Sequence, residues 1–151
     1  MTQERTLILV KPDAMQRALA GEVISRYERR GLKIVGMKLM RIDRETAERH
    51  YGEHREKSFF PGLVTYITSS PVIAAVLEGP NAIDAVRATN GATNPIEATP
   101  GSLRADFGLE KGRNLVHASD SAESAVREVA LFFDEKELVA WPRDADAWIF
   151  E

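Results

Sequence analysis

This sequence offers few candidates for a nucleophile or general base, because the chain has three histidines and no cysteine. His117 closes the segment Asn114-Leu115-Val116-His117, which we expect to form a strand, and a helix is expected to begin soon after it. Unpaired backbone N–H groups and the helix dipole favour negative charge at a helix N-terminus, so a phosphate on this imidazole would be stabilised there. A partly buried histidine that only satisfies a strand end would give the same pattern.

Three cations could accompany such a phosphate. Lys11 follows the first expected strand, Arg87 lies on a later helix, and Arg104 falls in a long loop. Cations from three separate elements could neutralise a polyphosphate from several sides, although each one alone is typical of a solvated surface charge. The sequence contains neither G-x-x-x-x-G-K-[ST] nor G-x-G-x-x-G, so phosphate would have to be held by side chains and metal.

A second candidate site is the string His50-Tyr51-Gly52-Glu53-His54, which matches the H-x-x-E-H pattern of inverted zinc peptidases. On a helix, His50 and His54 would share a face and could bind zinc, with Glu53 as general base. Gly52 weakens such a helix, and no third ligand is marked. The alternative is the end of an amphipathic helix followed by a charged stretch.

Length and composition limit the class of protein. A chain of 151 residues with 44% hydrophobic and 28% charged residues fits one domain over 1–151, with a C-terminal tail over 134–151. The absence of cysteine excludes disulfide frameworks, iron–sulfur clusters and thiol nucleophiles. The sequence has no apolar run of membrane-spanning length and no signal peptide, so we expect a cytoplasmic protein with no membrane partner. A net charge of −3 argues against general affinity for nucleic acid.

Hydrophobic periodicity predicts the elements that must position these residues. Strands are expected over residues 6–10, 32–42, 72–77 and 114–117, and Val35, Met37 and Leu39 share one face of the second. Helices are expected over 20–30, 44–51 and 62–69, from Gly79-Pro80 onward, and after a capping box at Asp120-x-x-Glu123. Residues 90–112 read as a long irregular loop, which is usually functional.

This order of elements indicates an α/β (α+β) fold. Paired helices between two βαβ-like halves suggest a ferredoxin-like βαββαβ core, a four-stranded antiparallel sheet covered by helices. Periodicity alone does not fix the order of the strands. The tail carries Trp141, Trp148 and Phe150 without a regular period, and we expect their side chains to pack on the same subunit or on a neighbour.

Five segments together resemble the nucleoside diphosphate kinase family, in the family's order and at its spacing. They are Lys11-Pro12-Asp13-Ala14, His50-Tyr51-Gly52-Glu53-His54, Phe59-Phe60-Pro61-Gly62-Leu63, Gly91-Ala92-Thr93-Asn94-Pro95 and Asn114-Leu115-Val116-His117-Ala118-Ser119-Asp120-Ser121. The resemblance implies a ping-pong transfer, in which the γ-phosphate of a nucleoside triphosphate passes to His117 and then to a nucleoside diphosphate. It also implies broad base and sugar specificity, a Mg²⁺ held by the nucleotide phosphates rather than by the protein, and a homo-oligomer, with a hexamer favoured.

The resemblance also assigns residues to roles. Glu128 and Ser119 match the pair that orients the catalytic imidazole, and Phe59 matches the aromatic that stacks on the base. The positions that match phosphate or ribose contacts are Lys11, Tyr51, His54, Arg87, Thr93, Arg104 and Asn114. A catalytically weak nucleotide-binding or interaction protein on the same scaffold is the alternative hypothesis, and a zinc hydrolase that uses His50 and His54 is the third.

The sequence departs from the family where glycine is common, at Ala18, Ser70, Ala105 and Ala118. A Cβ at a position of positive φ costs about 1 kcal/mol or more, whereas alanine elsewhere stabilises by restricting the unfolded chain. Ala118 bears most on the turnover rate, because it is adjacent to the expected nucleophile.

Overall fold

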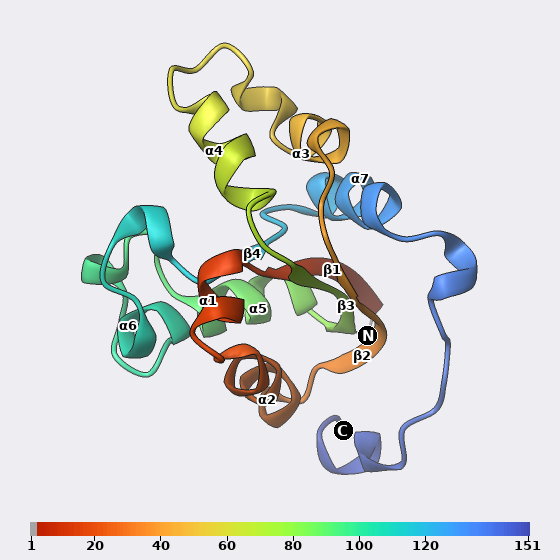
Figure 1. The fold of residues 1–151 in the computed structure, drawn as a ribbon. Coiled ribbons are helices and arrows are strands. Elements are labelled where there is room, and N and C mark those ends of the chain that lie inside the picture. The colour runs from red at the N-terminus through yellow and green to blue at the C-terminus, as the bar shows by residue number, and fades with distance from the viewer. Residues whose placement is uncertain (1–2) are drawn as a thin grey trace.

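A four-stranded antiparallel sheet forms the centre of the molecule, in a computed structural model that describes residues 3–151 (Figure 1). The strands are β1 (Gln3–Val10), β2 (Lys33–Met40), β3 (Val72–Pro80) and β4 (Val116–Ala118), in the order β2-β3-β1-β4. Each adjacent pair is antiparallel. The predicted ferredoxin-like sheet is therefore confirmed, and the structure supplies the strand order that the sequence left open.

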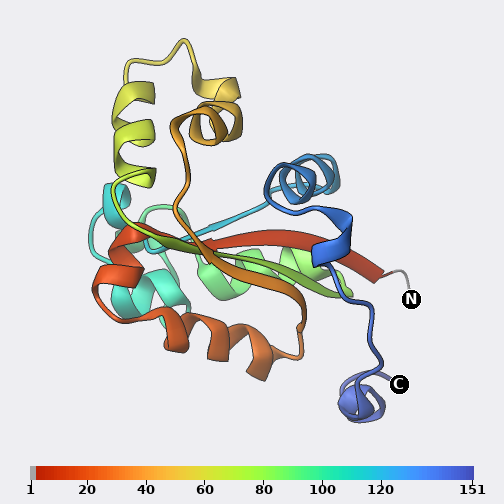
Figure 2. The same ribbon diagram turned by 45° about the vertical axis from the view of Figure 1, so that its right-hand side comes forward.

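Helices cover both faces of this sheet (Figure 2). On one face lie α2 (Ala20–Arg30) and α5 (Ala82–Asn90), and on the other α3 (Arg44–His50), α4 (Phe60–Ile67) and α7 (Ala122–Phe132). Strand β1 is buried on both sides because its side chains alternate, with Ile8 in the core under α2 and α5 and Leu9 in the core under α3, α4 and α7. The branched run of the first predicted strand thus serves two cores.

Several predicted caps and bounds are confirmed, and others are shifted. Helix α2 ends at Gly31, whose φ of +106° is the left-handed terminator that glycine favours, and Asp43 caps α3 by accepting from the backbone N–H of Thr46. The predicted cap at Asp120 is wrong, because Ser121 takes that place and accepts from the N–H of Ser124. Both residue types are good caps, so the sequence pattern could not separate two adjacent candidates.

Two helices begin elsewhere than predicted. Helix α4 runs over Phe60–Ile67 rather than 62–69, with Pro61 in its first turn. Strand β3 continues through Pro80, and α5 begins at Ala82 after Asn81, whose φ is +54°. Gly79-Pro80 therefore closes a strand and does not open a helix, which is possible because proline is tolerated at a strand end.

Strand β2 contains an irregularity that the alternating pattern did not predict. Its register against β3 shifts between Ile34 and Gly36, so Val35 is an extra residue. Val35 is buried, whereas Met37 and Leu39 are 52% and 66% exposed. The three apolar residues therefore do not share one buried face.

The long loop and the tail are more ordered than their sequences suggest. Residues 90–112 include a short helix, α6 (Leu103–Phe107), and another unpredicted short helix, α1 (Pro12–Gln16), follows β1. The tail folds back along the free edge of β2, where the N–H of Val139 donates to the carbonyl of Val35 and the indole of Trp141 donates to that of Ile34. Trp148 remains 91% exposed. No helix within residues 3–151 is long and apolar enough to cross a membrane.

Only one of the four alanine or serine residues that replace a common glycine lies at a left-handed position. Ala18 has a φ of +57°, and Ser70, Ala105 and Ala118 are not among the positive-φ residues of the described chain. The steric cost of a Cβ therefore falls on Ala18, which lies between α1 and α2. Ala118, next to His117, carries no such strain.

Candidate active site

A cavity of about 910 Å³ opens where β4 meets α3, α5 and the segment after α5. All but two of the predicted site residues line it: Lys11, Tyr51, His54, Arg87, Thr93, Arg104, Asn114, His117 and Glu128. These residues are spread over more than a hundred positions of the sequence. The fold therefore gathers the predicted set at one place.

The two exceptions lie next to the cavity. Ser119 is fully buried, and its hydroxyl donates to Glu128 Oε1 at 2.8 Å. Phe59 is 51% exposed, and its ring centroid lies 5.6 Å from that of His54. Ser119 thus lies behind the cavity wall, and Phe59 presents a half-exposed ring next to His54, which lines the cavity.

The His117 imidazole is held from one side only. Its Nε2 lies 2.9 Å from Glu128 Oε1, the same oxygen that accepts from Ser119. Ser119 Oγ in turn accepts from the backbone N–H of Leu7 on β1 at 3.3 Å. Because a carboxylate oxygen only accepts, Nε2 carries the proton and the lone pair of the neutral ring is on Nδ1. None of the described residues forms a hydrogen bond with Nδ1, so its lone pair is free.

The charge of Glu128 is maintained in spite of its burial. Burial alone would raise the pKa of this carboxyl group, but hydrogen bonds from His117 and Ser119 hold the pKa below its usual range. Glu128 is 5% exposed and is therefore shielded from water. A fixed negative charge on the far side of the ring suits a reaction in which the imidazole gains positive charge.

A strained turn directly precedes β4, the strand that carries His117. Leu115 has a φ of +76°, and the N–H of Val116 donates to the carbonyl of Asn114, which together form a tight γ-turn of the rare positive-φ kind. The N–H of Leu115 donates to Asp13 Oδ2, and its carbonyl accepts from the N–H of Lys11. Such a conformation costs about 1–3 kcal/mol and persists only where its surroundings hold it.

Arg104 joins three parts of the cavity wall. Its guanidinium donates to the backbone carbonyls of Gly91, Asn114 and Val116 at 2.9, 3.1 and 2.6 Å. These bonds use three of the five N–H groups, and the other two remain for a ligand. Arg104 is 8% exposed, so it both braces the wall and supplies positive charge.

Lys11 is placed for an anion by its neighbours. Its ammonium donates to Asn114 Oδ1 at 2.8 Å, and the Asn114 amide donates to the carbonyl of Thr93 at 2.9 Å. Burial and then repulsion from Arg104 lower the pKa of Lys11 to about 8, against an opposing effect of Asp13. Bound phosphate would relieve this repulsion.

Arg87 and Tyr51 complete the polar wall. Arg87 Nη1 donates to the carbonyl of Ala118 at 3.4 Å, next to His117. Burial raises the pKa of Tyr51 to about 12, so its hydroxyl stays protonated and can donate to an anion. Lys11, Arg87 and Arg104 therefore line one cavity with the lone pair of an imidazole, an arrangement suited to a polyphosphate.

The H-x-x-E-H string does not form the helical zinc motif. Helix α3 ends at His50, and Gly52–His54 is a separate 3₁₀ turn, so the two histidines do not share a helix face. His50 is instead buried against His117, with ring centroids 4.5 Å apart and planes at 83°. Gly52 interrupts the helix where the sequence predicted weakness. The zinc-hydrolase hypothesis based on His50 and His54 therefore loses its geometry.

Sequence reasoning missed the structural roles of three site residues, Asp13, His50 and Leu115. The signal for Asp13 was its place shortly after the first strand, two positions beyond Lys11. The left-handed turn at Leu115 left no signal, because leucine rarely adopts it. His50 was noted only as a metal ligand, since helix periodicity does not reveal a contact with a distant strand.

Comparisons with known proteins agree with this geometry. The sequence profile of the nucleoside diphosphate kinase family matches residues 4–138. The nucleoside diphosphate kinase of Archaeoglobus fulgidus is 62% identical over 148 residues, which are 98% of each chain, and that of Chloroflexus aurantiacus is 57% identical over 150 residues, 98% of this chain and 99% of the relative. A halophilic nucleoside diphosphate kinase from Halobacterium salinarum, solved in complex with CDP, has a TM-score of 0.97 at 52% identity, covering 99% of this chain and 100% of that one. The matched range includes every residue that lines the cavity.

Proposed function

This chain belongs to the nucleoside diphosphate kinase family, enzymes that transfer phosphate between nucleotides, and we propose that it does so by a ping-pong mechanism through a phosphohistidine at His117. The observation that carries the proposal is the one-sided hold on His117. Glu128 fixes the proton on Nε2 at 2.9 Å, and the lone pair on Nδ1 shares a cavity with three cations. A neutral imidazole in this state is a nucleophile near pH 7.

In the first half-reaction, the Nδ1 lone pair of His117 forms a bond to the γ-phosphorus of a nucleoside triphosphate. The bond from that phosphorus to the β,γ-bridging oxygen breaks, and the nucleoside diphosphate leaves with the electron pair. Nε2 keeps its proton throughout, and the positive charge that develops on the ring is opposed by the Glu128 carboxylate. The second half-reaction reverses these steps with another diphosphate as acceptor.

The cations account for the rest of the transfer. Phosphoryl transfer depends mainly on in-line positioning and on stabilising charge over the transferred oxygens. We assign Lys11 and the two unused N–H groups of Arg104 to that charge, and Arg87, Tyr51, His54 and Thr93 to the phosphates of the remaining nucleotide. Asn114 orients Lys11 through the 2.8 Å bond to its ammonium.

Broad specificity follows from how few groups would contact the base. Phe59 presents a half-exposed, apolar ring next to His54, which lines the cavity, and stacking on it would accept purines and pyrimidines alike. Lys11 and Asn114 would contact sugar hydroxyls common to many nucleotides. The relative from Halobacterium salinarum binds CDP, and we propose nucleoside di- and triphosphates as ligands of this chain as well.

Members of this family generally use a divalent cation, and we propose Mg²⁺ here. Mg²⁺ requires an octahedral set of oxygen ligands with several waters. In the described part of the chain, the one group of three side chains that could hold a metal is His50, His117 and Glu128, with two nitrogens and one carboxylate, which does not suit Mg²⁺. Mg²⁺ would therefore arrive on the nucleotide phosphates, where it supplies charge neutralisation.

The proposal also covers the organisation of the whole chain. We propose a single domain over 1–151 with the tail over 134–151, a cytoplasmic location, no nucleic-acid or membrane partner, and a homo-oligomer, with a hexamer favoured. The exposed apolar residues Met37 and Leu39 on the edge strand and Trp148 on the tail support self-association. Sedimentation equilibrium tests the proposed homo-oligomer, and a monomer at micromolar concentration would contradict it.

The proposed mechanism is tested by isolating the half-reaction. The protein is incubated with ATP labelled at the γ-phosphate, separated from nucleotide, and then given an unlabelled diphosphate. We expect label that is stable to base, labile to acid and discharged by the diphosphate. His117→Gln should take no label, whereas His54→Gln should still take it, and normal label on the His117 variant would refute the site. A protein that binds nucleotide but takes no label would favour the non-catalytic alternative.

A further inference from the structure

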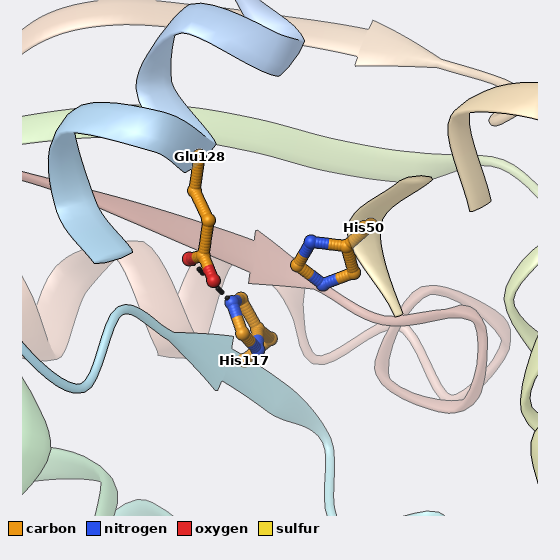
Figure 3. A group of neighbouring side chains, drawn as sticks. All are labelled: His50, His117 and Glu128. Atoms are coloured by element: carbon orange, nitrogen blue, oxygen red, sulfur yellow. Dashed lines mark hydrogen bonds and ion pairs between the residues drawn. The ribbon is translucent and has the colours of Figure 1, made fainter. Parts of the chain in front are cut away.

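We propose that His50, His117 and Glu128 form a binding site for a borderline divalent cation such as Zn²⁺, and that its occupancy switches off the nucleophile. The three side chains come from α3, β4 and α7 and converge on one another (Figure 3). One ligand atom from each lies within 4.8 Å of the others. Binding rests on this geometry alone, and only the inhibition rests on the proposed function.

The donor set is typical of zinc. Two imidazole nitrogens and one carboxylate oxygen form the His₂Glu combination that binds Zn²⁺ at about 2.0–2.2 Å. Ligands of one tetrahedral ion lie about 3.4 Å apart, a distance calculated from those bond lengths. His117 Nε2 and Glu128 Oε1 are 2.9 Å apart and would have to separate by about 0.5 Å, whereas the ligand nitrogen of His50 lies within 4.8 Å of both and would move closer.

His50 provides the independent sign of a ligand. Its side chain is 4% exposed, and both ring nitrogens are buried without a hydrogen-bond partner among the described residues. Buried polar atoms are nearly always satisfied, and an exception calls for a bound ion, a water or a functional role. His50 also lines the cavity with His117 and Glu128, so an ion could enter from it and keep a fourth position open there.

Inhibition follows from the arithmetic of protons on one ring. Neutral His117 has a single proton, which Glu128 holds on Nε2. When a metal takes the Nε2 lone pair, that proton must reside on Nδ1, and the ring stays neutral. Nδ1 then has no lone pair with which to attack phosphorus. The metal therefore disables Nδ1 by binding the opposite nitrogen of the same ring.

Nearby cations set the limits of this site. Lys11 and Arg104 line the same cavity, and Arg127 Nη2 lies 4.0 Å from Glu128 Oε2. These charges oppose a bare dication and favour an anion, such as hydroxide or a phosphate oxygen, at its open position. We therefore expect Zn²⁺ affinity to rise when inorganic phosphate is added.

The test uses the full chain without nucleotide and titrates it with ZnCl₂ against a chromophoric chelator. We expect one tight equivalent, with affinity lowered at least about tenfold in His50→Gln and kept in the matched control His54→Gln. On the unaltered protein, imidazole ¹⁵N NMR should show Zn²⁺ shifting the nitrogens of His50 and His117 and leaving those of His54. Because this spectrum needs no variant, it decides the matter even where His50→Gln fails to fold.

A second arm measures function. Labelling by ATP, with Mg²⁺ in excess, should fall in proportion to the bound Zn²⁺ and recover on addition of a zinc-selective chelator, with each variant compared with its own zinc-free rate. No saturable binding, equal affinity in His50→Gln, or shifts confined to His54 would overturn the metal site. Label on His117 without zinc binding would leave the proposed function standing, whereas tight zinc binding without any phosphoenzyme would overturn that function and the switch but not the site.

Discussion

Replacing Glu128 with glutamine removes one charge and, with it, the 4.0 Å ion pair between its Oε2 and Arg127 Nη2. Both hydrogen bonds at this residue, from His117 Nε2 and Ser119 Oγ, go to the same oxygen, Oε1. An amide can put its carbonyl oxygen there, so the tautomer and orientation of the ring are kept. What is lost is the negative charge that opposes the positive charge developing on the imidazole. The substitution therefore isolates the electrostatic part of the mechanism.

The size of the effect follows from the kind of hydrogen bond. A hydrogen bond to a charged, buried group contributes about 1.5–3 kcal/mol, compared with about 1 kcal/mol for a neutral one. If that difference of about 0.5–2 kcal/mol appears wholly in the transition state, Glu128→Gln slows phosphorylation of His117 by about 2- to 30-fold. Ser119→Ala, which removes a neutral donor and keeps the charge, should slow it less.

Single-turnover labelling in a quench-flow instrument measures the rate, and a non-hydrolysable triphosphate measures binding. Nucleotide affinity should change little, because Glu128 contacts Nε2 of His117, on the opposite side of the ring from the free Nδ1. Glu123→Gln is the matched control, an exposed glutamate on the same helix, and it should behave as the unaltered protein does. An unchanged rate in Glu128→Gln, or equal losses of rate and affinity, would refute the electrostatic role.

Three further predictions concern charge, strain and the turn below the nucleophile. Because the pKa of Lys11 is lowered to about 8, kcat/KM should fall as the pH rises above 8 and Lys11 loses its proton. Lys11→Gln should lower kcat/KM and abolish this fall at alkaline pH. The same alkaline fall in the variant would contradict the assignment. The same lowered pKa affects stability, because above about pH 8 the unfolded chain binds more protons at Lys11 than the folded chain does. The free energy of unfolding should therefore rise between about pH 8 and the pKa of Lys11 in the unfolded chain. Urea unfolding of the unaltered protein and of Lys11→Gln at pH 7 and pH 9 measures this rise. Ala18→Gly should stabilise the fold by about 0.5–1 kcal/mol by relieving a φ of +57°, whereas Ala105→Gly in α6 should destabilise it by a similar amount; the same sign for both in thermal unfolding would exclude the backbone explanation. Asp13→Ala should lower stability by about 1–3 kcal/mol and slow labelling of His117, because the N–H of Leu115 loses its acceptor and the strained turn relaxes. Unchanged stability and an unchanged labelling rate would show that the turn does not depend on Asp13.

Local patterns predicted the elements whose signals lie within one segment. The branched run before Lys11 predicted a strand buried on both faces, and Gly31 predicted the end of α2. Asp43 predicted the start of α3 for the same reason, since a cap acts only three residues away. Shifts arose where neighbours compete, as at Asp120 and Ser121, or where tertiary contacts decide.

The sequence nominated residues that the fold brings to one cavity, but it did not predict how they face one another. A family resemblance placed Glu128 with His117, yet no spacing rule predicts that Oε1 serves two donors. The bulge at Val35 and the left-handed Leu115 depend on pairing with distant strands and side chains, and their residue types do not announce them. The contact between His50 and His117 belongs to the same class. Local propensity determines elements, and long-range packing determines how reactive atoms face one another.

In the proposed mechanism, one ring nitrogen, Nδ1 of His117, is free to carry the phosphoryl group. Long-range ¹H–¹⁵N NMR of the protein phosphorylated by ATP distinguishes the two ring nitrogens and is anchored by ³¹P coupling. We predict that the phosphoryl group lies on Nδ1 of His117, with Nε2 still protonated beside Glu128. A phosphoryl group on Nε2, or on a residue other than His117, would contradict the account.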